Sequence, residues 1–243
     1  MLADDLRALW AIMCKDLRAY YFKPPNVSWG ILFPLAFVLA FAIRDPSSLE
    51  TMVPGLLALT LLFGASSMEA IVITFERRIG ALERLLLAPV RLPALLAGKI
   101  LGGVVFGLVT ALVVLVLALA VFGLGSVNWL LLVLAMILSA AVFSTMGALV
   151  SVAVKEVFEA QTLANLFRFP MMFLGGVFVP VEALPPGLQV VARLLPLTYA
   201  VEALDGAMTG GSWAAAGASL GVLVAFTALF FGLATWTLAR SLV

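Results

Sequence analysis

The sequence LLAGKILGGVVFGLVTALVVLVLALAVF occupies residues 95–122, and Lys99 is the charged residue within it. A membrane-spanning helix needs about 20 consecutive, mostly apolar residues, so this stretch can cross a bilayer with some tilt. Five further stretches have the same character, which predicts an all-α, polytopic membrane protein with six transmembrane helices. The six predicted spans cover residues 27–43, 52–73, 95–122, 129–154, 160–179 and 213–238.

The composition of the whole chain agrees with lipid as its main solvent. The 243 residues are 64% hydrophobic and 11% charged, whereas soluble domains are about 45–50% apolar and about 25% charged. We therefore expect residues 1–243 to form a single transmembrane domain. The net charge of +1 gives no sign of a nucleic-acid partner.

The residues that usually carry covalent or metal chemistry are scarce. The chain has no histidine and a single cysteine, Cys14, which excludes a disulfide within the chain and argues against a metal centre or a Cys/His nucleophile. The Gly98-Lys99 pair lacks the upstream glycine and the following Ser or Thr of a phosphate-binding loop. We therefore expect no enzyme activity, no bound metal and no cofactor in this chain.

Positively charged residues mark the cytoplasmic side of a membrane protein, and here they alternate from one connection to the next. One set of connections carries Arg7, Lys15, Arg18, Lys23, Arg77, Arg78, Arg84, Arg91, Lys99, Lys155 and Arg240. The other set carries only Arg44 and Arg193. Both termini are therefore predicted to be cytoplasmic. Cleavage of a signal peptide near Ala40-Phe41-Ala42 is disfavoured, because the region before the apolar run is too long.

Residues 1–26 are predicted to hold an amphipathic helix that precedes the first span. Its apolar stripe consists of Leu6, Leu9, Trp10, Met13, Leu17 and Tyr20, which recur at spacings of three and four. Its opposite face carries Asp4, Arg7, Lys15 and Arg18. We expect this helix to lie in the cytoplasmic headgroup layer. The alternative is a helix that packs on the protein.

The connection at residues 74–93 reads TFERRIGALERLLLAPVRLP. An apolar stripe is formed by Phe75, Ile79, Leu82 and Leu86, and glutamates and arginines repeat at a spacing of seven on another side. This pattern predicts a helix at residues 75–88 that docks a cytoplasmic partner and that Pro89 ends. A solvated connector is the alternative. The predicted docking residues are Phe75, Glu76, Arg77, Arg78, Gly80, Leu82, Glu83 and Arg84.

Residues 180–211, between the fifth and sixth spans, are not an ordinary outer loop. Four prolines interrupt them (Pro180, Pro185, Pro186 and Pro196), yet most of the other residues are apolar. Because such a segment is poorly solvated by water, we predict two short helices that dip into the outer leaflet, as re-entrant structure does when protein surrounds it.

Two charges fall within predicted spans. Glu69 belongs to the second span and Arg168 to the fifth, and both are expected in the inner half of the bilayer. A charge at that depth is costly unless it is paired or wetted. We predict that the two side chains pair, within one subunit or across a dimer, or line a polar entry. Independent snorkelling to the headgroups is the alternative.

Three stretches, in order and in register over nearly the whole chain, resemble the permease subunits of ABC-2-type exporters. The first is Glu76-Arg77-Arg78-Ile79-Gly80-Ala81-Leu82-Glu83-Arg84-Leu85, followed by Ala88-Pro89 and Gly98-Lys99. The second is Phe169-Pro170-Met171-Met172-Phe173-Leu174-Gly175-Gly176-Val177-Phe178-Val179-Pro180. The third is Leu195-Pro196-Leu197-Thr198-Tyr199-Ala200-Val201-Glu202-Ala203-Leu204. Arg168, just before the second stretch, departs from the neutral residue expected there.

The resemblance implies a six-span subunit in the plasma (inner) membrane of a prokaryote. This subunit would pair with a second copy or a paralogue and sit on two cytoplasmic ABC ATPase subunits, which bind ATP and magnesium. Residues 75–88 would then be the coupling helix, residues 1–26 an interfacial elbow, and spans two and five the seam of the dimer. The aromatic fifth span favours an amphipathic or hydrophobic cargo such as a drug, a lipid or a lipid-linked glycan. Phe169, Met172 and Phe173 are candidates for its route.

The sequence thus predicts the membrane subunit of an exporter that works by alternating access and is driven by a separate ATPase. An ion-coupled secondary carrier is one alternative, although one or two membrane charges are few for a coupling site. A permease of the haem-exporter type is another, and the proline-rich outer segment fits that group less well.

Overall fold

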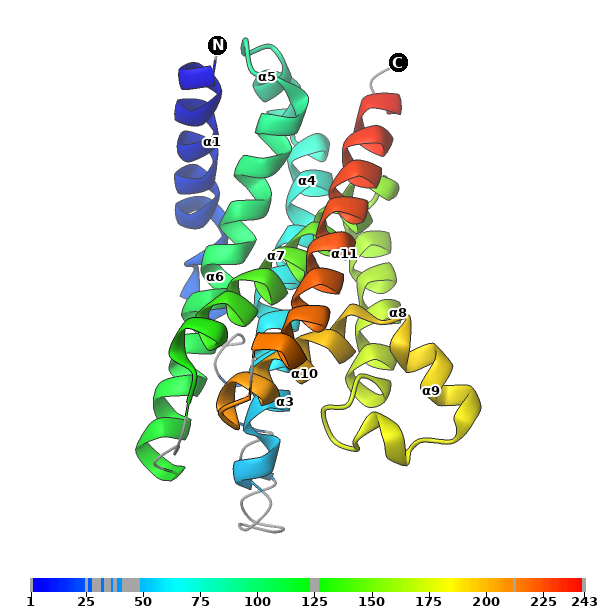
Figure 1. Cartoon of the computed structure of the whole chain (residues 1–243). Helices are drawn as coiled ribbons and strands as arrows, with labels where there is room; N and C mark the ends of the chain where they lie inside the picture. Colours follow the sequence, from blue (N-terminus) through cyan, green and yellow to red (C-terminus); the bar gives the residue numbers. More distant parts are fainter. Residues whose placement is uncertain are drawn as a thin grey trace.

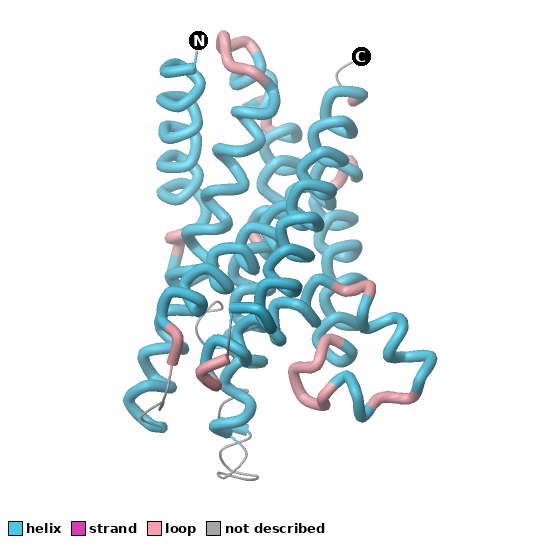
Figure 2. Tube along the Cα trace, viewed as in Figure 1, coloured by secondary structure: helices cyan, strands magenta, loops and turns pink. Residues whose placement is uncertain are grey.

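The computed structural model describes residues 2–24, 26–27, 32, 36, 39–40, 49–122, 127–211 and 213–241. Every regular element in these residues is helical (Figure 2). In chain order the elements are α1 (Leu2–Asp16), η1 (Leu17–Tyr21), α3 (Leu49–Ser67), α4 (Glu69–Arg78), α5 (Ala81–Leu86), α6 (Leu92–Phe122), α7 (Trp129–Ala153), α8 (Val157–Leu174), η3 (Val181–Ala183), α9 (Pro186–Arg193), α10 (Pro196–Met208) and α11 (Trp213–Arg240).

Within these residues, four helices are long and apolar enough to cross a membrane. They are Thr51–Arg78, which joins α3 and α4, then Leu92–Val121, Trp129–Ala153 and Ala216–Arg240. They correspond to the second, third, fourth and sixth predicted spans. Most of the predicted first span, residues 27–43, lies outside the described residues. Six spans therefore stay a prediction, of which the structure supports four.

The predicted fifth span differs from its expectation in length and polarity. Helix α8 begins at Val157 and ends at Leu174, five residues before the expected end. It stops there because Gly175 and Gly176 follow, and Gly176 takes a φ of 82°, a left-handed conformation that breaks an α-helix. The charged residues Glu159 and Arg168 also make α8 less apolar than the four long helices.

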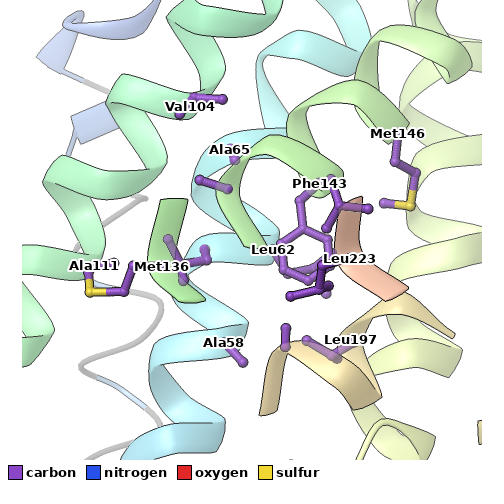
Figure 3. Packing of buried hydrophobic residues seen from close by; sticks show 14 of the residues in the cluster. Ala58, Leu62, Ala65, Val104, Ala111, Met136, Phe143, Met146, Leu197 and Leu223 are labelled. Carbon is purple, nitrogen blue, oxygen red and sulfur yellow. The ribbon is translucent and has the colours of Figure 1, made fainter. Parts of the chain in front are cut away.

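Helix α7 lies at the centre of the molecule and packs against α3, α4, α6, α8, α10 and α11 (Figure 1). Its residues are apolar on all sides, which is typical of a helix that other helices surround. Side chains from five helices meet around it, among them Leu62 of α3, Phe143 of α7 and Leu223 of α11 (Figure 3). By contrast, only 17% of the most apolar part of α11 is buried, so this helix presents its outer face to lipid.

Glycines set the spacing between α3, α6 and α7. A Cβ on Gly103 would lie 2.7 Å from the carbonyl oxygen of Ala65, and one on Gly147 would lie 2.9 Å from that of Ser66. Small residues at these positions thus allow the helix backbones to approach closely. Gly217 and Gly221 of α11 have no such role within the described chain, because there is open space around them.

The two ends of the bundle differ. Both described ends of the chain and α5 lie at one end, and α9 and the start of α3 lie at the other (Figure 1). At this second end α10 returns into the bundle and packs on α3, α7 and α11, whereas α9 exposes Leu188, Val190 and Val191. Residues 180–211 thus contain two short α-helices, as expected. Their depth in the outer leaflet stays a prediction.

Helix α1 lies alongside the first half of α6, and the two helices run in the same direction. Contacts proceed in step along both helices, from Asp5 with Arg91, through Leu9 with Gly98 and Asp16 with Lys99, to Tyr21 with Phe106. The face that packs includes Ile12 and Met13, while Leu6 and Trp10 of the predicted apolar stripe are exposed. One face of α1 therefore packs on the protein, and its position in the headgroup layer stays a prediction.

Candidate functional site

The predicted docking helix at residues 75–88 is two helices rather than one. α4 ends at Arg78, and α5 begins at Ala81. The break lies at Gly80, whose φ of 69° is left-handed and interrupts the helical hydrogen bonds. The continuous helix predicted from the repeat of seven is wrong for this reason, because that pattern carries no information about a single glycine in a left-handed conformation.

Helix α5 is held by its apolar side and exposes its charges. Leu82 is fully buried, and Leu85 and Leu86 pack against the core. The exposed residues at this end of the molecule include Phe75, Arg78, Ile79, Glu83, Arg84 and Leu87. Leu87 is 86% exposed, which is unusual for a leucine that does not face lipid or a partner. The predicted residues Arg78, Glu83 and Arg84 therefore lie on an accessible surface, which we call the α5 surface together with Ile79 and Leu87.

Glu76 does not share that surface, although the sequence pattern grouped it with Glu83. Its side chain is fully buried between α4, α6 and α1. The correction follows from the break at Gly80, because α4 and α5 point their residues in different directions. Arg77 is half-buried, and its guanidinium donates a hydrogen bond to the Ser241 hydroxyl at 3.3 Å.

Four charged residues from three helices form an ion network around Glu76. The Glu76 carboxylate contacts Lys99 of α6 and lies 2.5 Å from the Lys15 ammonium of α1. The Asp16 carboxylate lies 3.1 Å from Lys99 and 2.8 Å from Lys15. Asp16, Glu76 and Lys99 are fully buried, and Lys15 is partly exposed. Two carboxylates and two ammonium groups balance, as a buried cluster of charges requires.

The pKa values of two partly exposed residues in this region, Lys15 and Tyr20, are both raised. Burial alone would lower the pKa of Lys15, but hydrogen bonds to Asp16 and Glu76 outweigh it and raise the pKa above its usual value. Burial raises the pKa of Tyr20 to about 12, so its phenol is neutral at physiological pH. Lys15 therefore stays charged in the network.

The ion network marks the boundary of the apolar layer. Lys99 is the last charged residue before the apolar run of α6, and Glu76 lies in the last turns of the span Thr51–Arg78. Two residues, Ile79 and Gly80, separate α4 from α5. The network therefore ties the helix directly before the α5 surface to both α1 and α6.

Glu69 and Arg168, the predicted intramembrane pair, have different partners within the described chain. Glu69 is fully buried and accepts a 2.5 Å hydrogen bond from the Tyr21 hydroxyl. Arg168 is 1% exposed and donates to Ser66 Oγ at 2.8 Å and to Asn165 Oδ1 at 3.2 Å. The structure does not bring the two together within one subunit. A pair across a dimer stays a prediction.

The predicted route residues divide between the surface and the core. Phe169 and Phe173 are 47% and 60% exposed on α8, whereas Met172 is buried against the core. An open groove of about 760 Å³ runs along the exposed side of α8. Its lining consists of Val154, Phe158, Glu159, Thr162, Leu163, Asn165, Leu166, Phe169 and Pro170. We call this feature the α8 groove.

Sequence reasoning missed several residues of these sites. The sequence pattern places Lys15 on the face opposite the apolar stripe and counts Lys99 among the cytoplasmic positive charges, and it gives no role to Asp16. The available signal was the position of Asp16 and Lys99 beside apolar runs, where an unpaired charge is costly. Polar contacts between α4 and α7 were also missed, since Thr74 donates to the carbonyl oxygen of Ser151 at 2.7 Å. Among the described residues, none of the acidic groups has a metal-binding arrangement.

Replacing Gly80 by valine should destabilise the protein by about 1–2 kcal/mol, because a β-branched residue is strained at a left-handed φ. A Cβ there would meet only Glu83 Oε2, at 3.8 Å, so the cost comes from the backbone and not from a clash. The midpoint of thermal unfolding in mild detergent measures it. Gly187→Ala, at a helical position with open space around it, is the control and should not lower the midpoint. An equal loss of thermal stability in Gly80→Val and Gly187→Ala would show that the left-handed conformation of Gly80 is not the cause.

The apolar helices arranged around α7, with a charged end and an apolar end, define a polytopic helical membrane protein. Comparison with known sequences identifies its class further. The inner membrane transport permease YadH of Escherichia coli (strain K12) is 30% identical over 97% of this chain and 94% of YadH. The putative transport permease ycf38 of Cyanophora paradoxa is 27% identical over 79% of this chain and 70% of that protein.

A third relative, the ABC transporter G family member 20 of Dictyostelium discoideum, is 27% identical over 73% of this chain and 25% of its own length. The sequence model of the ABC-2 type transporter family matches residues 7–209. The chain therefore belongs to the ABC-2 type transporter family, and it is a transport permease subunit without catalytic chemistry of its own.

Proposed function

We propose that this chain is the membrane subunit of an ATP-driven exporter, docked through the α5 surface to a separate cytoplasmic ABC ATPase. One observation carries the proposal, namely an exposed, charged two-helix junction that is rigidly tied to the transmembrane helices by buried ion pairs. Permeases of this family generally pair with ABC ATPases, and one relative of this chain carries the name of an ABC transporter. ATP and magnesium would be bound by the partner.

The arrangement supports a direct mechanical route. α5 follows α4 after two residues, so a push on the α5 surface displaces the last turn of α4, which carries Glu76. Glu76 contacts Lys99 of α6 and Lys15 of α1. Because separating these buried charges is costly, α1, α4 and α6 should move as one unit. Closure of the ATPase dimer would then be passed to three helices at the cytoplasmic end, as alternating access requires.

The second subunit, a copy or a paralogue, would associate through α8. The exposed side of α8 combines apolar residues such as Phe158 and Leu166 with Glu159 and Thr162. Polar side chains on a membrane helix are poor lipid neighbours and serve helix contacts or a wetted path. The second span was expected to share the seam, but 78% of its most apolar part is buried within the chain. We therefore assign the seam mainly to α8.

The location and direction of transport follow from the same proposal. The end of the bundle that holds both termini and α5 would face the cytoplasm, in agreement with the concentration of arginine and lysine there. The relative YadH carries the name of an inner membrane permease, and we propose the same membrane for this chain. Its cargo would be amphipathic or hydrophobic, such as a drug, a lipid or a lipid-linked glycan.

Affinity purification of the tagged chain from native membranes, followed by mass spectrometry, tests the docking. The unchanged chain should bring down an ABC ATPase in a fixed ratio. A variant with Arg78, Glu83, Arg84 and Leu87 changed to alanine should lose at least about nine-tenths of it, since truncating several central contacts removes most of an interface's affinity. Its thermal unfolding should not change, because all four side chains are exposed.

The matched control changes four exposed residues at the other end of the bundle, namely Glu182, Leu188, Val190 and Arg193, to alanine. This variant should retain the ATPase. If the unchanged chain purifies without any ATPase, under conditions that keep other transporter complexes intact, the proposal fails and an ion-coupled carrier becomes the better reading.

A further inference from the structure

Arg168 is a buried cation whose charge is not balanced within the described chain. Its guanidinium donates to two neutral oxygens, Ser66 Oγ and Asn165 Oδ1, and lies over the Phe63 ring at 5.9 Å from the ring centre. Its Nη2 atom is buried and has no hydrogen-bond partner among the described residues. A guanidinium in this state is costly at membrane depth, so a counter-charge from outside the described residues would stabilise it.

The carboxylates of α3, α4 and α8 are badly placed to supply this charge. Glu69 is fully buried and bonded to Tyr21. Glu159 lies nine residues before Arg168 on α8, about 13 Å along the helix axis. Glu50, near the start of α3, is sixteen residues before Ser66, which corresponds to about 24 Å along the helix axis.

The carboxylates of a second copy of the chain are also badly placed to balance the charge of Arg168. Two copies in one membrane have the same orientation, so a twofold axis runs along the membrane normal and each residue of one copy lies at the depth of its counterpart. The Glu159 of a second copy would therefore also be about 13 Å from the level of Arg168. The Glu69 of a second copy is fully buried inside that copy, so it is not exposed to the Arg168 of the first.

The α8 groove, which is large enough to hold a ligand, lies next to Arg168. Asn165 both lines the groove and accepts the hydrogen bond from Arg168. Phe169 also lines the groove and packs on Phe63, at 6.5 Å between ring centres. Most of the groove is apolar, with Phe158 and Leu166 on its wall. A volume of about 760 Å³ is within the range of small-molecule sites.

From this geometry we propose that the α8 groove binds an amphiphile with an anionic group, such as a phosphate, sulfate or carboxylate, and that Arg168 recognises this group. The apolar part of the ligand lies along Phe158, Leu166 and Phe169. Rotation of the Asn165 side chain opens the guanidinium to the groove. Only the interpretation of this ligand as cargo rests on the export function proposed above. The groove shares Phe158, Glu159, Thr162 and Leu166 with the side of α8 that we assign to the seam, so the ligand would lie at the seam, and its binding requires no ATP.

A photo-crosslinking experiment tests the site. The purified full chain is placed in nanodiscs of phosphatidylcholine and exposed to a dodecyl phosphate probe that carries a diazirine. A dodecyl trimethylammonium probe with the same photoreactive group serves as the cationic control. The phosphate probe should label residues 157–170 at least about tenfold more than the cationic probe, because charge-assisted hydrogen bonds to a buried guanidinium select the anion. Equal labelling by both probes would overturn the proposal.

Two variants of the site separate recognition from folding. Arg168→Gln should remove the preference for the phosphate probe, and Arg168→Lys should keep part of it. Arg168→Gln is not the deciding variant, since it can also disturb folding. Asn165→Asp is nearly isosteric and places a carboxylate beside Nη1, 3.2 Å from the position of Oδ1. It should raise the midpoint of thermal unfolding and reduce phosphate-probe labelling at least about tenfold.

A competition measurement with a bilayer lipid identifies the source of the ligand. Phosphatidylglycerol added to the nanodiscs should not compete if the site takes a separate amphiphile, and competition at membrane amounts would assign the same site to a bilayer lipid. Arg193→Gln, at the exposed end of α9, is the control variant and should leave all labelling unchanged. If Asn165→Asp folds but labels as strongly as the unchanged chain, Arg168 does not bind the anion.

Discussion

Replacing Lys99 by methionine should lower the free energy of unfolding by about 3–5 kcal/mol, the usual cost of leaving a buried ion pair without one partner. Lys99 is fully buried between Asp16 and Glu76, so its loss leaves two buried carboxylates with Lys15 as their only cation. Methionine keeps most of the volume of the side chain. The midpoint of thermal unfolding in mild detergent and the yield of monodisperse protein both measure the effect.

A double variant identifies the cause of that loss. In Lys99→Met combined with Glu76→Gln, one buried negative charge is removed together with the positive one, and Asp16 keeps Lys15. This double variant should be more stable than Lys99→Met alone, since the imbalance of buried charge is smaller. Lys155→Met, at an exposed position, is the control and should change little. If the losses of unfolding free energy in Lys99→Met and in Glu76→Gln simply add in the double variant, the ion network does not act as a unit.

Gly103→Leu is the second variant with a large expected effect, through packing rather than charge. A Cβ at this position would meet the Ser144 hydroxyl and lie 2.7 Å from the carbonyl oxygen of Ala65, which belong to α7 and α3. Both neighbours are on helices that cannot withdraw without separating the centre of the bundle. The expected loss is at least about 1–3 kcal/mol, the usual cost of an overpacked core.

The matched control is Gly221→Leu on α11, where a Cβ meets nothing within 4 Å. This variant should fold as well as the unchanged chain and should be neutral or slightly stabilising, because leucine favours a helix more than glycine does. Similar unfolding midpoints for the two leucine variants would show that α3, α6 and α7 do not pack as closely as the structure has them.

The parts of the fold that depend on local composition could be predicted from the sequence. Four of the six predicted spans are present as long apolar helices, with ends close to those expected. The end of α8 could not be placed, because Gly176 has to adopt a left-handed φ before the helix stops, and neighbouring residues alone do not determine this. The same reason explains the break at Gly80 within the predicted docking helix.

The candidate sites were predictable only in part. Arg78, Glu83 and Arg84 lie on the surface where their spacing placed them, and Arg168 is buried as its position within a span suggested. Glu76 has the same spacing pattern as Glu83 but lies in the ion network. Local sequence could not separate the two, since the environment of each depends on α1 and α6 as well as on its own helix.

By itself, the sequence determined the class of the protein, a bundle of apolar helices in a membrane, and its charged connections. The free energy of transferring a segment from water to lipid depends on its own residues and their immediate neighbours. A continuous stretch of sequence therefore suffices to predict a membrane span. Only the tertiary structure decided which charges are buried together. Lys15 and Glu76 are 61 positions apart, and Asp16 and Lys99 are 83 apart. Ion pairing acts over a few ångströms in space, and folding alone brings such distant residues together.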